Sequence, residues 1–71
     1  MENLDGVDFV VRTHGSIWQF MPLTQIAKNF TGTDLDIQSW QWMGPWFCVD
    51  ARIANDLVTA LEEEGFTLKL E

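Results

Sequence analysis

Two side chains in this sequence have the chemistry of a covalent catalyst, and each type occurs once. Cys48 is the single cysteine and His14 the single histidine of the 71 residues. A catalytic Cys-His pair needs the two groups within about 3 Å of each other. His14 falls in a predicted two-residue turn, and Cys48 stands between Phe47 and Val49, where a free thiol is usually buried. We therefore predict a structural thiol and a chain that is not an enzyme.

Two groups of acidic residues are candidates for a binding role. Asp34 and Asp36 lie two residues apart in a polar stretch, but a calcium loop needs several more oxygen ligands at fixed positions. We predict a solvated loop, with no metal and no cofactor. Glu62, Glu63 and Glu64 fall in the last turn of a predicted helix, where the helix dipole disfavours negative charge. Because that placement has a cost, these residues are predicted to belong to a protein-binding surface, together with Asp34 and Asp36.

Three of the four tryptophans lie in the segment SWQWMGPWF. Trp40 and Trp42 are two residues apart, which predicts one shared face of a strand, and Trp46 begins the next strand. A core this small cannot take every ring, so we expect Trp40 or Trp46 to be partly exposed. An exposed tryptophan is a typical anchor in protein interfaces, and both residues are candidate protein-binding residues.

Length and charge limit the remaining classes. Seventy-one residues predict a single domain over 1–71, and one cysteine excludes an internal disulfide. The formal net charge of −7 opposes direct contact with nucleic acid or anionic membranes, and base stacking on aromatic rings normally accompanies a positive groove. The acidic N-terminus lacks a secretory pattern, and no apolar run approaches a membrane span. We expect a cytoplasmic protein with a basic protein partner.

The hydrophobic pattern predicts the order β-β-α-β-β-α-β. Two hairpins are expected, one turning at His14-Gly15 and one at Gly44-Pro45. A short helix is expected to follow Pro22 and end at Gly32, and a longer helix to begin at Asp50. The last strand alternates apolar and polar residues from Phe66 to Glu71. The predicted fold is a small α+β domain, with two helices packed on one face of a mainly antiparallel sheet.

The pieces GSIWQFMPLT, WMGPWFCVDARIANDL and EEGFTL carry a family resemblance. They resemble small uncharacterised proteins of phages and proteobacteria that share a Gly-Ser hairpin, a Pro-Leu-Thr helix start and Trp-x-Gly. In that pattern a strand ends in an acidic residue, with Arg two positions later. The resemblance spans most of residues 15 to 68, and the chain departs from it at Trp40, Trp46 and Cys48. It implies a compact fold encoded on a mobile element and transfers no activity or catalytic residue.

Two functions remain open. The first is a phage inhibitor of a host nucleic-acid-binding or defence complex, similar to anti-CRISPR proteins, whose acidic surface occupies a basic site in the host cytoplasm. The second is a cytoplasmic accessory or regulatory protein without an inhibitory role, including a homodimer formed through an open sheet edge. Acidic side chains gathered beside an exposed tryptophan would favour the first, and scattered ones the second.

Overall fold

The computed structural model describes residues 6–71 of the chain. In this range one sheet has the strand order β3-β4-β2-β1-β5, and all its neighbouring strands are antiparallel except β1 and β5. None of the helices in the same range has the length and apolar character needed to cross a bilayer. The elements in chain order are β1 (Phe9–His14), β2 (Ile17–Pro22), α1 (Gln25–Thr33), the short 3-10 helix η1 (Ser39–Gln41), β3 (Trp42–Met43), β4 (Trp46–Asp50), α2 (Ala51–Glu63) and β5 (Leu68–Leu70).

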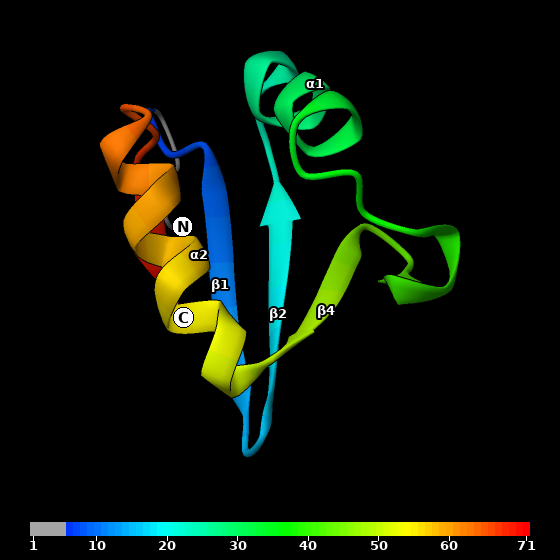
Figure 1. The fold of residues 1–71 in the computed structure, drawn as a ribbon. Coiled ribbons are helices and arrows are strands. Elements are labelled where there is room, and N and C mark those ends of the chain that lie inside the picture. The colour runs from blue at the N-terminus through cyan, green and yellow to red at the C-terminus, as the bar shows by residue number, and fades with distance from the viewer. Residues whose placement is uncertain (1–5) are drawn as a thin grey trace.

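The predicted α+β class is confirmed, and both helices pack on the same face of the sheet. Ala27 of α1 joins Ala54 and Leu61 of α2 in one buried cluster with side chains of β1, β2 and β4. α2 runs alongside β1, and α1 lies beyond the end of β2 (Figure 1). Because side chains alternate between the faces of a strand, every second residue enters this core. The strand members of the cluster are Phe9, Val11, Phe20 and Phe47.

The first hairpin turns one residue later than predicted. His14 pairs with Ile17, so the two-residue loop is Gly15-Ser16 and the predicted loop at His14-Gly15 is wrong. Gly15 has a φ of 59°, a left-handed conformation that glycine adopts without a steric penalty. His14 is therefore the exposed last residue of β1.

The first helix also starts and stops later than predicted. Pro22 is the last residue of β2, opposite Phe9, and does not lie in the first helical turn. The helix begins after Thr24, whose side chain accepts the N–H of the third residue that follows, at 3.2 Å. Gly32 lies inside α1, which continues to Thr33 because glycine tolerates a helical backbone as well as a left-handed one.

The second hairpin turns at Gly44-Pro45 as predicted, but its first strand is short. β3 contacts β4 through two residue pairs, and Trp42 belongs to the first of them. Trp40 does not share a strand face with Trp42, which corrects the prediction. The chain is coiled there because the Gln41 N–H donates to the Gln38 carbonyl at 3.0 Å, which closes a 3-10 turn around Trp40.

Asp8, next to β1, makes hydrogen bonds to two other segments of the chain. Its Oδ1 accepts the Thr24 hydroxyl at 2.8 Å, and its Oδ2 accepts the Thr67 N–H at 2.9 Å. Its backbone carbonyl also accepts the Leu23 N–H at 2.7 Å. Asp8 therefore joins β1 to the start of α1 and to the segment that leads into β5.

Replacing Asp8 by alanine is expected to lower the free energy of unfolding by about 1–3 kcal/mol, because two hydrogen bonds to a charged acceptor are lost. Urea unfolding, followed by fluorescence, measures the change. Asp56→Ala is the matched control, since that exposed carboxylate makes no side-chain hydrogen bond within residues 6–71, and it should change stability by less than about 0.5 kcal/mol. Equal stability of the two variants would show that the hydrogen bonds of Asp8 do not stabilise the fold.

Candidate functional site

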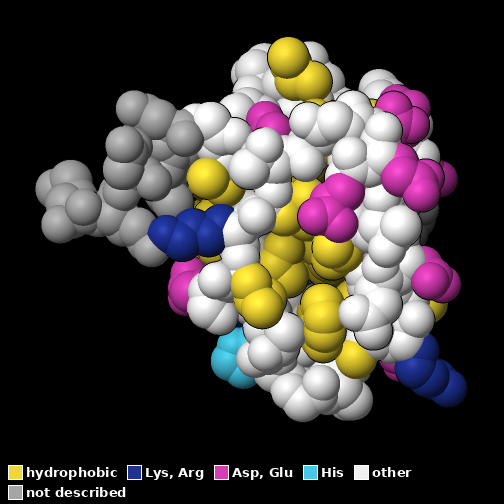
Figure 2. Space-filling view, turned by 90° about the vertical axis from the view of Figure 1, so that its left-hand side faces the viewer, with side chains coloured by type: hydrophobic (Ala, Val, Ile, Leu, Met, Phe, Trp, Pro, Cys, Tyr) yellow, Lys and Arg dark blue, Asp and Glu magenta, His cyan; other side chains and the backbone are white. Residues whose placement is uncertain are grey.

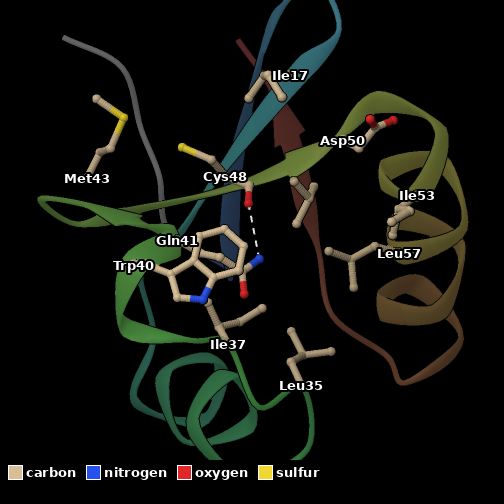
Figure 3. A pocket seen from close by; sticks show the side chains of 11 residues that line it. Ile17, Leu35, Ile37, Trp40, Gln41, Met43, Cys48, Asp50, Ile53 and Leu57 are labelled. Atoms are coloured by element: carbon tan, nitrogen blue, oxygen red, sulfur yellow. Dashed lines mark hydrogen bonds between the residues drawn. The ribbon is translucent and has the colours of Figure 1, made fainter.

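An open groove of about 590 Å³ lies between β4, α2 and the segment that connects α1 to β3. Side chains from these elements converge on it from several directions (Figure 3). Its volume falls in the range of sites that hold a small ligand or the anchor side chains of a protein partner. Its apolar lining consists of Ile17, Leu35, Ile37, Trp40, Met43, Val49, Ile53 and Leu57, and its polar lining of Gln41, Cys48 and Asp50.

The groove gathers most of the large hydrophobic side chains that the described chain leaves in solvent. Trp40 is 80% exposed, Met43 64%, Ile53 61% and Ile17 40%. Six large hydrophobic residues in this part of the chain are exposed, and four of the six line this one groove. Scattered apolar residues are normal on a surface, whereas a contiguous patch marks an interaction site.

Trp40 is held at the rim by its neighbour in sequence. The Gln41 Nε2 donates to the Cys48 carbonyl of β4 at 3.3 Å, and its Oε1 accepts the Gln38 N–H at 3.1 Å. These bonds fix η1 against β4 while the Trp40 indole points to solvent. The prediction that Trp40 or Trp46 stays partly exposed is confirmed, most strongly for Trp40.

The charged side chains of the groove are acidic. Asp50 caps α2 as predicted, since its Oδ1 accepts the Arg52 N–H at 2.8 Å. The Arg52 guanidinium also bonds this carboxylate, at 3.0 and 3.2 Å, and these bonds hold the pKa of Asp50 below its usual value. Asp34 and Asp36 are exposed on either side of Leu35, which lines the groove. Two of the sequence-predicted acidic residues therefore lie next to the groove.

Trp46 lies on the face of the sheet opposite the helices, directly across from Met43. The Arg12 guanidinium stacks 3.9 Å from the centre of its ring, and the Arg12 Nε donates to the Gln19 side chain at 2.6 Å. Trp46 is half-buried by this contact and does not line the groove. Of the two tryptophans predicted as binding residues, Trp40 lines the groove and Trp46 is covered by Arg12.

Glu62, Glu63 and Glu64 lie at the end of α2, away from Trp40. Glu62 lines a second, smaller crevice, whose lining shares no residue with that of the groove. α2 stands between the two hollows, because residues 53 and 57 face one and residues 55, 58 and 62 face the other. The predicted acidic residues do not form a single patch with the tryptophan.

Cys48 and His14 do not form a catalytic pair. They occupy β4 and β1, which flank β2 on opposite sides, so two strand spacings of about 4.8 Å separate their backbones. The Cys48 thiol is half-buried and accepts the Gln19 Nε2 at 3.5 Å. Over the described residues, no group of three or more His, Cys, Asp or Glu side chains is placed to hold a metal ion.

Sequence reasoning missed Ile53, Met43 and Ile17 as site residues. Ile53 belongs to an apolar stripe along α2 with Ala54, Leu57, Val58 and Leu61. This stripe is wider than the part of the helix surface that the sheet covers, and 61% of Ile53 remains exposed. The width of the stripe was the available signal. Met43 and Ile17 carried no such signal, since each lies at the end of a strand, next to a tryptophan.

Comparison of the chain with protein-family models, with curated proteins and with solved structures finds no match.

Proposed function

We propose that this chain is a protein-binding protein and that the groove beside Trp40 is its principal contact surface. One observation carries the proposal: four exposed large hydrophobic side chains converge on a single groove, with Trp40 80% exposed at its rim. Tryptophan is one of the residue types enriched at interface hot spots, because a partner can bury its large ring at little entropic cost.

The chemistry of the partner follows from the charge. The chain carries a formal charge of −7, and Asp34, Asp36 and Asp50 lie on or next to the groove. A complementary surface offers apolar side chains to the groove and Lys or Arg to its margin. The partner is therefore a basic protein, and a site that normally binds nucleic acid meets this description.

In its more specific form, the proposal is that a phage or another mobile element encodes the chain as an inhibitor of a host nucleic-acid-binding or defence complex. The acidic charge and the apolar groove support this role. The separation of Glu62 from Trp40 by α2 favours the alternative, a cytoplasmic accessory protein whose acidity keeps it soluble. An α-helix is only about 10–12 Å across, so one partner that encloses α2 contacts both sides.

Replacing Trp40 by alanine tests the proposal. Affinity for a partner captured from host lysate and then purified is expected to fall about thirtyfold or more, because a central tryptophan typically contributes at least 2 kcal/mol. Isothermal titration calorimetry measures the change. Ile26→Ala is the matched control, since Ile26 is 71% exposed and lines neither hollow, and it should leave affinity unchanged. A Trp40→Ala protein that binds as tightly as the wild type would refute the proposed surface.

A further inference from the structure

The outer edge of β5 has no neighbouring strand in the described part of the chain. β5 stands last in the sheet, and only β1 pairs with it. The Thr67 carbonyl accepts an N–H of β1 at 3.2 Å, and the Glu71 N–H donates to a β1 carbonyl at 2.7 Å. Because backbone groups alternate in direction along a strand, Leu68 and Leu70 turn their N–H and C=O groups to the outer side. This side offers two donors and two acceptors to another strand.

A crevice of about 250 Å³ adjoins this edge. It lies between α2 and the β1-β5 pair, and Leu70 at its margin is 67% exposed. Figure 2 faces this side of the molecule and shows hydrophobic side chains in a hollow, with acidic side chains beside it. The apolar lining consists of Val11, Trp18, Val58, Leu68 and Leu70.

The charge of the crevice is negative. Glu62 is its single charged lining residue, and Asn55 its other polar one. Glu63 and Glu64 follow at the end of α2, and the side chains of all three glutamates are without an ion pair among the described residues. Arg52, the one basic residue of α2, lies at the opposite end and is bonded to Asp50.

We propose that this edge and crevice bind an extended, basic segment of a partner protein, which adds to β5 as a further strand. This inference rests on the proposed function, in that the chain binds protein, and adds a second surface on the other side of α2. The segment would pair its backbone with Leu68 and Leu70 and place every second side chain over the crevice. Most of those side chains are apolar, and one of them is a Lys or Arg that meets Glu62.

A second copy of the chain fits this edge poorly. A two-fold antiparallel pairing that uses all four outward backbone groups sets Leu68 of one copy opposite Leu70 of the other. Each copy brings a formal charge of −7 to the contact. The complementary occupant is a basic segment.

A synthetic array of hexapeptides with all combinations of Val, Leu, Ser, Lys and Glu, probed with the fluorescently labelled full chain, tests the proposal. The bound peptides should carry apolar residues and one Lys at the alternate positions that face the crevice. The peptide that binds best is then measured in solution by fluorescence anisotropy. N-methylation of the alternate peptide amides that face β5 should weaken binding about fivefold per methyl group. Methylation of the other alternate set should leave it unchanged.

Variants of the chain complete the experiment. Leu70→Pro removes an outward N–H and should weaken peptide binding beyond the effect of Leu70→Ala, which keeps that donor; thermal unfolding of both variants confirms that they fold. Trp40→Ala should leave peptide binding unchanged, which separates this surface from the groove. The proposal would be overturned if no peptide of the array bound, or if methylation of either set of amides weakened binding equally. Loss of peptide binding in the Trp40→Ala variant would also overturn it. So would a stable dimer of the free chain in sedimentation equilibrium.

Discussion

Replacing Phe47 by alanine is expected to leave the protein largely unfolded at room temperature. Phe47 is fully buried, stacks on Phe20 with ring centres 5.3 Å apart, and meets Trp42 edge to face at 5.4 Å. Removing such a ring typically costs about 3–5 kcal/mol. A chain of this size without a disulfide rarely has more than about 3–5 kcal/mol of stability in total. One substitution therefore removes most of the difference between the folded and unfolded states.

The dispersion of amide signals in an NMR spectrum and urea unfolding both measure this loss. Trp40→Ala serves as the control, because it deletes a larger ring that is 80% exposed and should change the free energy of unfolding by less than about 0.5 kcal/mol. The free energy of unfolding of the Phe47→Leu variant should lie between those of the other two variants, since leucine keeps much of the buried volume. A folded Phe47→Ala protein within about 1 kcal/mol of the wild type would show that the core can collapse around the cavity.

The contrast between Phe47 and Trp40 indicates what the sequence can predict. Phe47 lies in a regular strand, so alternation alone places it on the same face as Val49 and opposite Cys48, as the structure has it. The same regularity identified α2 and its cap at Asp50. These features depend on residues that are close in sequence, and local periodicity determines them.

The errors occur where a distant contact decides the local structure. Pro22 was assigned to a helix because proline suits a first turn, but pairing with Phe9 draws it into β2, and Asp8 reaches Thr24 to help fix the helix start. Trp40 was assigned to a strand because it alternates with Trp42, but Gln41 bonds to β4 and coils the chain. Neither contact leaves a periodic signal in the sequence.

The groove could be predicted only in part. Ten of its eleven lining residues lie between positions 35 and 57, but the turns and the strand-helix junction that bring them together are not periodic. Ile17 joins them only because β2 pairs with β4, which places Ile17 opposite Asp50. The expectation of an exposed tryptophan followed from volume alone, since one small core cannot enclose four indoles. Which tryptophan remained outside depended on the η1 turn and on the Arg12 side chain that covers Trp46.

Reversing Glu62, Glu63 and Glu64 to lysine is expected to change stability and binding in opposite directions. The helix dipole places partial negative charge at the end of α2, so the three lysines relieve a repulsion there and should raise the melting temperature by a few degrees. Each reversal adds two charges, which takes the formal net charge from −7 to −1. Association with a basic partner should then slow about tenfold or more at low salt.

Surface plasmon resonance at several salt concentrations, with the purified basic partner immobilised, measures the association and dissociation rates separately. The loss of affinity should come mostly from a lower association rate. It should become smaller as the salt concentration rises, because the screening length falls from about 10 Å at 0.1 M to about 3 Å at 1 M. Replacing the same three residues by glutamine removes charge without reversing it and should give an intermediate rate. Because the lysine variant is expected to fold more stably than the wild type, weaker binding cannot come from unfolding. An unchanged association rate at low salt would therefore exclude the three glutamates from the interface and leave the groove beside Trp40 as its contact surface.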